Sequence, residues 1–160
     1  EKVAGFGFSV LGWSKNEKSI SGVTSLTGTD GFTRCLAEAD YVVSVLPLTE
    51  DTQNIYNADS FAKMKPGAFF INCGRGMQVD EDALIAALDS GHLSGACLDV
   101  FRVEPLPQDH ALWDHPKVTI WPHVSAQTNP ITAATQVFDS IMAIREGKPP
   151  VNPVNISRGY

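Results

Sequence analysis

Short apolar runs typical of β-strands alternate along this chain with segments whose apolar residues repeat at helical spacing. The clearest runs are YVVSVL at 41–46 and AFFINC at 68–73, which are rich in β-branched and aromatic side chains. Asp80 and Gly91 bracket a helical pattern, the first as an N-cap and the second as a glycine after the last turn. Strands and helices in this order predict an α/β fold built on a parallel, doubly wound sheet with right-handed crossovers.

The remaining elements follow from the same patterns. Further strands are expected at 9–13, 96–100 and 118–121, and helices at 32–39, 57–64 and 130–146. The run at 68–73 is apolar almost throughout, which is typical of a strand covered on both faces of its sheet. Residues 1–6 read as the last turn of a helix that has no beginning here, so we expect that something precedes them in a longer protein.

Composition narrows the class of function. The 160 residues are 43% hydrophobic, which is enough to bury one core of ordinary size. The 18 Asp and Glu exceed the 12 Lys and Arg, and the net charge of −6 argues against nucleic acid or an anionic membrane as the main partner. Three cysteines without CxxC spacing suit a reducing compartment, and no uncharged apolar run approaches the length of a membrane span. We therefore expect a cytoplasmic protein with a small-molecule partner.

Three chemically useful side chains each follow an expected strand. Arg75 lies between two glycines, Glu104 precedes a proline, and His123 follows one. Because the carboxyl ends of parallel strands meet at one edge of a sheet, we expect these groups to converge on one pocket. A guanidinium that holds an anion, beside an imidazole with a carboxylate, is suited to general acid–base catalysis. Taken singly, each residue could be a solvated loop charge, and the histidine spacings predict no metal site.

The segment INCGRGMQVDEDALIAALDSGHLSGACLDVFRVEPLPQDHALWDHPKVTIWPHVSA closely resembles the second half of the D-isomer specific 2-hydroxyacid dehydrogenases. Within that family the likeness is to the glyoxylate/hydroxypyruvate reductase branch, and it extends to the closing ISRGY. The resemblance implies a partial Rossmann-like dinucleotide-binding domain at 1–129, without the first strand and its GxGxxG loop. It also implies a carboxy-terminal helix and tail at 130–160 that return toward the substrate domain, and a homodimer for the full-length protein.

The resemblance further implies reduction of a small 2-oxoacid to the 2-hydroxyacid. In this family the arginine of the GRG segment binds the substrate carboxylate and polarises the carbonyl, which assigns both roles to Arg75. Glu104 would pair with His123 and keep it protonated, and His123 would give the proton while the nicotinamide gives the hydride. Two alternatives stay open: a nucleotide-sensing binding module similar to the corepressors of this fold, and an inactive fragment. We expect poor activity from these 160 residues alone, because they contain no glycine loop for the pyrophosphate.

Further residues are placed around the dinucleotide by the same resemblance. They are Leu46, Pro47 and Thr52 on the adenine side, Asp99 at the nicotinamide carboxamide, and the backbone at Cys73, Gly74 and Ser125 beside the nicotinamide ring. Plain packing and helix capping explain Leu46 and Thr52 equally well.

The residues after the strand at 9–13 bear on which dinucleotide is bound. NAD-binding domains place an Asp or Glu there to hold the ribose 2′-hydroxyl, whereas this chain has Trp13, Ser14 and Lys15. Ser14 and Lys15 suit a 2′-phosphate, and we expect no acid to stand in its way. NADP(H) is therefore favoured over NAD(H), with a solvated turn as the alternative.

Overall fold

The computed structural model describes residues 2–155 of the chain. Its elements are α1 (Lys2–Gly5), β1 (Val10–Trp13), β2 (Val23–Leu26), α2 (Gly28–Glu38), β3 (Tyr41–Ser44), α3 (Ala58–Lys63), β4 (Phe69–Asn72), the 3₁₀ turn η1 (Gly76–Gln78), α4 (Glu81–Asp89), β5 (Gly95–Leu98), β6 (Val118–Ile120) and α5 (Pro130–Arg145). All the strands that we expected from the sequence are present, and their ends agree within two residues.

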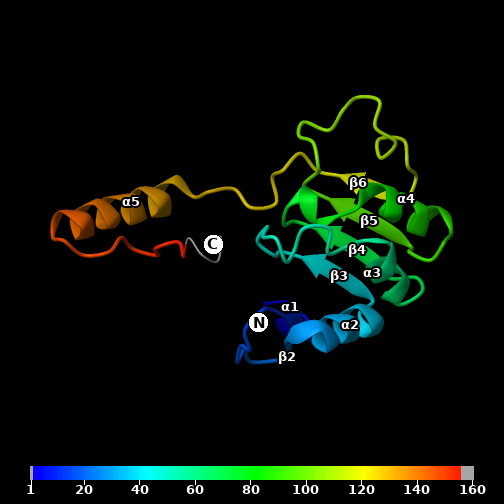
Figure 1. Ribbon diagram of the computed structural model, residues 1–160, viewed down its shortest axis with the longest axis horizontal. Helices are drawn as coiled ribbons and strands as arrows, with labels where there is room; N and C mark the ends of the chain where they lie inside the picture. Colours follow the sequence, from blue (N-terminus) through cyan, green and yellow to red (C-terminus); the bar gives the residue numbers. More distant parts are fainter. Residues whose placement is uncertain (1, 156–160) are drawn as a thin grey trace.

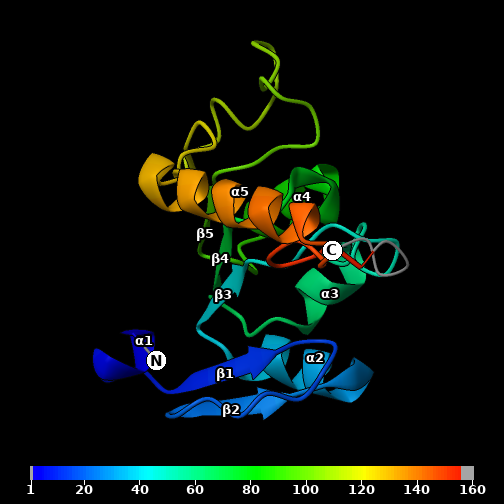
Figure 2. The same cartoon turned by 90° about the vertical axis from the view of Figure 1, so that its left-hand side faces the viewer.

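Every strand pairing is parallel, as the alternation of strands and helices predicts. β3, β4, β5 and β6 lie side by side in that order, with Ser44 opposite Asn72 and Asn72 opposite Leu98. β1 and β2 form a separate two-stranded sheet, which Figure 2 shows below the larger one. No strand pairing among residues 2–155 joins the two sheets. The parallel arrangement brings the carboxyl ends of β3 to β6 to one edge.

β2 and the first turn of α2 were missed in the sequence. β2 is a short, partly polar segment (VTSL), and it is stabilised by its pairing with β1, where Val10 lies opposite Val23. α2 begins at Gly28, four residues earlier than we expected, and Thr27 before it has the extended backbone of an N-cap. Gly28 and Gly31 in this first turn are typical of a loop, so the sequence pattern did not predict the start of the helix.

The hydrophobic core lies between the larger sheet and the helices α2, α3 and α4. Phe70 and Leu98 from the sheet, and Phe61, Leu84 and Leu88 from the helices, are all at most 2% exposed. Figure 2 shows α3 and α4 on the same side of the strands. Full burial of a side chain of this size contributes about 1.5–3 kcal/mol, so this packing holds the strand ends firmly in place.

A series of aromatic rings connects the two sheets. Trp13 of β1 lies 4.9 Å from Phe32 of α2, Phe32 lies 6.0 Å from Tyr56, and Tyr56 lies 4.9 Å from Phe70 of β4, measured between ring centroids. Tilted ring pairs at these separations are favourable. The end of β1 is therefore positioned against the larger sheet by side-chain packing.

The opposite face of the larger sheet is open. Tyr41 and Val43 of β3 are 61% and 54% exposed, whereas Val42 and Ser44 between them are buried. β4 alternates in the same way between buried and half-buried positions. The expectation that the run at 68–73 is covered on both faces is therefore wrong for the described part of the chain. Right-handed crossovers between strands that advance in one direction place α3 and α4 on one face only.

α5 lies apart from both sheets. The Asn129 side chain accepts hydrogen bonds from the backbone N–H groups of Ile131 and Thr132, and Pro130 occupies the first turn, as the sequence predicts. Figure 1 shows the helix projecting from the domain at the end of an extended segment, and none of its residues is buried. Within residues 2–155, no helix has the length and apolar character needed to cross a membrane.

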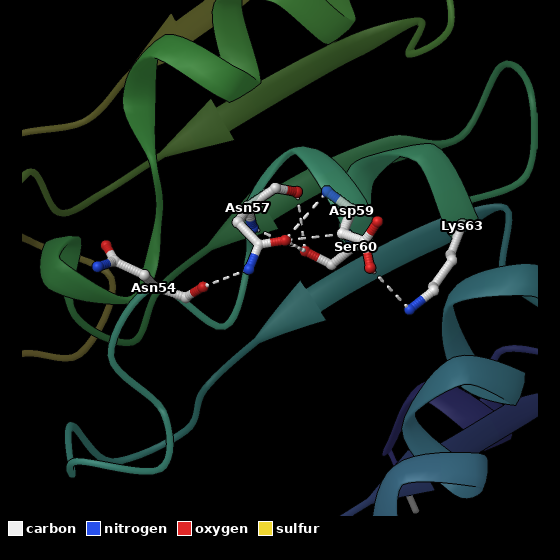
Figure 3. Close-up of polar contacts among 5 residues, drawn as sticks. All are labelled: Asn54, Asn57, Asp59, Ser60 and Lys63. Carbon is white, nitrogen blue, oxygen red and sulfur yellow. Dashed lines mark hydrogen bonds and ion pairs between the residues drawn. The ribbon is translucent and has the colours of Figure 1, made fainter.

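α3 begins with a capping box (Figure 3). Asn57 Oδ1 accepts the backbone N–H groups of Asp59 and Ser60 at 3.0 and 3.2 Å, and Ser60 Oγ accepts the N–H of Asn57 at 2.7 Å. Asn57 Nδ2 also donates to the backbone oxygen of Asn54 at 3.1 Å. The cap therefore fixes both the helix and the loop that precedes it.

Candidate active site

One open pocket of about 260 Å³ is lined by Arg75, Glu104 and His123. These residues follow β4, β5 and β6, so they reach the pocket from neighbouring strands at the carboxyl edge of the sheet. The rest of the wall consists of Leu48, Gly76, Met77, Phe101 and Arg102. The structure thus brings together the three side chains that were expected to converge.

His123 and Glu104 form the polar centre of the pocket. His123 Nδ1 lies 2.8 Å from Glu104 Oε2, and Glu104 Oε1 accepts the backbone N–H of Phe101 at 2.9 Å. Partial burial acts to raise the pKa of Glu104, but the hydrogen bonds from His123 and Phe101 outweigh it and leave the pKa below its ordinary value. The ionised carboxylate holds one ring nitrogen of the imidazole, which leaves Nε2 to act on a ligand.

Asp99 holds the loop that carries His123. The His123 backbone is in the left-handed region with φ of 55°, and its N–H donates to the backbone oxygen of Asp99 at 2.9 Å. The Asp99 carboxylate, only 3% exposed, accepts the N–H groups of Val124 at 2.8 Å and of Ser125 at 3.1 Å. Burial favours a higher pKa for Asp99, but these hydrogen bonds lower it overall. Binding of a carboxamide by Asp99 stays a prediction.

Arg75 is exposed at the end of β4. Its Nη1 donates to the backbone oxygen of Gly74 at 2.7 Å, while its own backbone is held by Gln78 Oε1 at 3.2 Å and by Asn72 Nδ2 at 3.2 Å. None of the ion pairs in the described part of the chain involves Arg75. Its positively charged guanidinium group is therefore available to bind an anionic ligand.

The two glycines beside Arg75 are required by close packing. A Cβ atom on Gly74 would lie 2.5 Å from Gln78 Oε1, and one on Gly76 would lie 1.9 Å from the carbonyl carbon and oxygen of Phe101. The GRG loop therefore runs directly against the start of the segment that carries Glu104. Its glycines serve this contact as well as the bend of the backbone.

Gln78 organises the site and was not identified from the sequence. It is fully buried, and its Nε2 donates to the backbone oxygens of Leu46 and Pro47, both at 3.0 Å. Its Oε1 accepts from Ser44 Oγ and from the backbone N–H of Arg75, both at 3.2 Å. Gln78 thus ties the loop after β3 to the loop after β4. Nothing in its local sequence distinguishes it from a surface glutamine, because three of its four partners lie more than 30 residues away, at 44–47.

The residues expected on the adenine side lie in the loop that follows β3. Leu46 is half-buried and Pro47 is exposed, while Thr52 is buried and donates from Oγ1 to the backbone oxygen of Pro47 at 2.8 Å. Cys73 directly follows β4, and its N–H donates to the backbone oxygen of Ser44 at 3.0 Å. Thr52 therefore has the packing role that we weighed as an alternative, and the adenine contact stays a prediction.

The end of β1 differs from the expectation in one respect. Trp13 packs on Phe32, and Ser14 Oγ donates to a backbone oxygen two residues further along at 2.6 Å. Lys15 Nζ, however, lies 3.2 Å from Asp51 Oδ2. The expectation that no acid stands in the way of a 2′-phosphate is wrong at this lysine, because the loop after β3 brings in the Asp51 carboxylate, 36 residues away in sequence.

Comparison with known proteins agrees with this geometry. A family model described as the NAD binding domain of D-isomer specific 2-hydroxyacid dehydrogenase matches residues 1–125. The chain belongs to this family. Among curated dehydrogenases of the family, glyoxylate/hydroxypyruvate reductase A of Serratia proteamaculans is 42% identical over 160 residues, and that of Yersinia enterocolitica is 41% identical over 159. The chain spans about half the length of these curated relatives, 51% in each case.

Solved structures of 2-hydroxyacid dehydrogenases match the whole fold. A D-isomer specific enzyme from Xanthobacter autotrophicus Py2, in complex with NADPH and MES, gives a TM-score of 0.96 at 45% identity and covers 99% of this chain and 66% of its own. An NADPH-dependent glyoxylate/hydroxypyruvate reductase from Sinorhizobium meliloti, in complex with NADP and sulfate, gives a TM-score of 0.93 at 38% identity. The match covers 99% of this chain and 52% of that one. The expectation of a Rossmann-like α/β dehydrogenase fold is therefore confirmed.

Proposed function

We propose that the polypeptide containing this chain reduces a small 2-oxoacid of the glyoxylate/hydroxypyruvate type to the 2-hydroxyacid with NADPH. The observation that carries the proposal is the convergence of Arg75, Glu104 and His123 on one pocket at the carboxyl edge of the sheet. The names of the curated relatives support the same substrate class. Membership of the family makes the protein an oxidoreductase that uses a nicotinamide dinucleotide.

Each of the three residues has a distinct task in this reaction. Arg75 binds the substrate carboxylate with its forked donors and stabilises the negative charge that develops on the carbonyl oxygen. His123 donates its proton from Nε2 to that oxygen, because Nδ1 is held by Glu104. Glu104 orients the ring and compensates the positive charge of its protonated form. Bound NADPH supplies the hydride.

The residues at the end of β1 fit NADP(H) better than NAD(H). Ser14 and Lys15 offer a hydroxyl and a cation there, and the strand ends in no acid of its own. The two solved relatives described above were crystallised with NADPH and with NADP. Asp51 weakens this preference, because its carboxylate competes with a 2′-phosphate for Lys15.

The other dinucleotide contacts belong to the same proposal. Leu46, Pro47 and Thr52 would lie along the adenine side, Asp99 would bind the nicotinamide carboxamide, and Cys73, Gly74 and Ser125 would line the nicotinamide ring. Support for this placement comes from the tight packing of Gly74, where a Cβ atom would collide with Gln78 Oε1 and the Leu46 oxygen, so its backbone is held in a fixed position after β4. Both oxygens of the Asp99 carboxylate accept backbone N–H groups of Val124 or Ser125, which fixes the carboxylate and the loop at 124–125 beside the proposed position of the ring.

In this proposal residues 1–129 form part of the dinucleotide-binding domain, and α5 with the tail to residue 160 returns toward the substrate domain. Residues 156–160 of the tail lie outside the part of the chain that the structure describes. Support comes from the apolar side chains that α5 exposes, among them Ile131 at 77% and Phe138 at 62%. Exposed apolar area on this scale is covered in most proteins by another domain or subunit. A homodimer of the complete polypeptide is part of the proposal, and sedimentation of that polypeptide tests it.

Steady-state oxidation of NADPH tests the proposed activity. The complete polypeptide is mixed with NADPH and with glyoxylate, hydroxypyruvate or pyruvate in turn. We expect turnover with glyoxylate or hydroxypyruvate, and faster turnover with NADPH than with NADH. Tight binding of NADPH without turnover of any 2-oxoacid would overturn the proposal in favour of a nucleotide-sensing module.

A further inference from the structure

Two consecutive backbone amides beside the pocket are each bound by a different glutamate. The N–H of Phe101 donates to Glu104 Oε1 and the N–H of Arg102 donates to Glu81 Oε1, both at 2.9 Å. The second oxygen of each glutamate faces a histidine: Glu104 Oε2 lies 2.8 Å from His123, and Glu81 Oε2 lies 3.4 Å from His110. A second Glu–His pair therefore stands behind the pair proposed for catalysis.

The peptide between Phe101 and Arg102 is the structural link between the two pairs. Its carbonyl lies against Gly76, where a Cβ atom would come within 1.9 Å of it and within 2.5 Å of the Arg102 nitrogen. The same peptide therefore touches the loop that carries Arg75 and begins the segment that carries Glu104. The position of this peptide therefore bears on the position of Glu104 relative to the GRG loop.

Glu81 is well suited to hold this peptide. Its side chain is only 12% exposed, and it lies in the first turn of α4, where a carboxylate is favoured by the helix dipole. The helix itself is anchored by Leu84 and Leu88, which are fully buried in the core. A charge-assisted hydrogen bond from such a rigid support fixes an amide more firmly than a neutral one.

His110 supports Glu81 from the other side. Its Nδ1 accepts the backbone N–H of Leu112, a residue that is fully buried, so the neutral ring carries its hydrogen on Nε2, toward Glu81. The Arg102 side chain adds a further attachment, since its Nη1 donates to Asn54 Oδ1 at 2.6 Å and to the backbone oxygen of Val79 at 2.7 Å. A second, polar pocket of about 390 Å³ lies around these groups, and Arg102 separates it from the first.

We propose that Glu81, backed by His110, is a positioning residue of the reductase site, which acts through the Arg102 amide to hold Glu104 against His123. The inference rests on the proposed function for its kinetic consequences. Loss of Glu81 would leave the Arg102 N–H without its acceptor and free the peptide to turn. The distance between Glu104 and His123 would then vary, and proton transfer in the reaction would slow while dinucleotide binding stayed the same.

The complete polypeptide with Glu81→Ala tests this directly. We expect kcat with glyoxylate to fall about tenfold, with KM for NADPH changed by less than about twofold. Glu81→Gln keeps an acceptor oxygen at the same reach and should recover most of the lost kcat. Asp82→Ala removes the same charge from the next, exposed position of α4 and should leave kcat within about twofold of the parent.

A double variant separates positioning from general destabilisation. In a Glu104→Ala background, Glu81→Ala should cost no further activity, because the residue through which it acts is already gone. An additional tenfold loss in that background, or equal losses for Glu81→Ala and Asp82→Ala, would overturn the inference.

A spectroscopic readout keeps the inference apart from the proposed function. If the parent turns over no 2-oxoacid, the proposed function fails, and the NMR signals of the His123 ring then report the positioning. Glu81→Ala should shift these signals and Asp82→Ala should not. Unchanged His123 signals in Glu81→Ala would overturn the inference whatever the activity of the parent.

Discussion

Lys15 Nζ lies 3.2 Å from Asp51 Oδ2, so a single ion pair connects the loops that follow β1 and β3. Both side chains are largely exposed, at 64% and 76%, and such pairs contribute little to stability. The effect of the pair is therefore expected in ligand binding. A dinucleotide phosphate that approaches Lys15 meets both the cation and the carboxylate that already binds it.

Lys15→Asp should reverse much of the preference for NADPH. The ratio of kcat/KM for NADPH to that for NADH is expected to fall at least about tenfold, because a hydrogen bond to a charged group contributes about 1.5–3 kcal/mol. Asp51→Asn should raise the ratio, since it frees the lysine. Steady-state kinetics with both dinucleotides measure the change, and Lys148→Asp, on an exposed lysine beyond α5, is the control. An unchanged ratio in Lys15→Asp would refute the assignment of the 2′-phosphate.

His123→Asn should remove the proton donor while it leaves the fold intact. We expect kcat/KM with glyoxylate to fall by about 100-fold or more, as is usual when a general acid is lost. Glu104→Gln should have a smaller effect, because the amide oxygen can still accept from the ring but carries no charge. Fluorescence titration with NADPH provides the control, since dinucleotide affinity should stay the same. A His123→Asn variant with more than half of the parental turnover would exclude this residue as the donor.

Gly76→Ala should destabilise the protein strongly. The new methyl group would lie 1.9 Å from the Phe101 carbonyl, so either the GRG loop or the segment after β5 must move, at a cost of about 1–3 kcal/mol or more. Gly5→Ala is the matched control, because no atom lies within 4 Å of the added Cβ there. Thermal unfolding of both variants measures the difference. Equal melting temperatures would mean that the loop has more room than the structure shows.

Asn57→Ala should weaken the start of α3. It removes the acceptor for the N–H groups of Asp59 and Ser60, and loss of such a cap costs about 0.5–2 kcal/mol. Asn57→Asp retains the acceptor but loses the hydrogen bond from Nδ2 to the Asn54 oxygen, so its stability should lie between those of the parent and Asn57→Ala. Urea unfolding followed by circular dichroism distinguishes the two, and the idea fails if both variants unfold at the same urea concentration as the parent.

Asp99 should contribute stability that depends on pH. Its pKa in the folded state is lowered, so the contribution is complete above the ordinary aspartate pKa of about 3.9 and is lost as the pH falls through the lower folded value. Asp99→Asn removes the ionised acceptor of the Val124 and Ser125 amides. The difference in free energy of unfolding between parent and variant should therefore be larger at about pH 6 than at about pH 3. A difference that is the same at both pH values would contradict this role.

Local sequence patterns were sufficient for most of the fold. β3 and β4 could be predicted because each is a compact β-branched or aromatic run, and the caps of α4 and α5 could be predicted because Asp80 and Asn129 precede clear helical patterns. β2 could not, because its four residues owe their conformation to pairing with β1. The open face of the larger sheet was also missed, since an apolar strand reads the same whether or not its second face is covered.

The sequence by itself determined the order of strands and helices, the residues that stand at the strand ends, and hence the meeting of Arg75, Glu104 and His123 in one pocket. Only the tertiary structure decided which distant groups contact the loops after the strands: Asp51 at Lys15 after β1, and Glu81 at the Arg102 amide after β5. The reason is that the two kinds of feature require different precision in atomic positions. Strand direction places a residue at an edge of the sheet, whereas a hydrogen bond requires two atoms from separate loops to come within about 3 Å, which depends on the packed course of both loops.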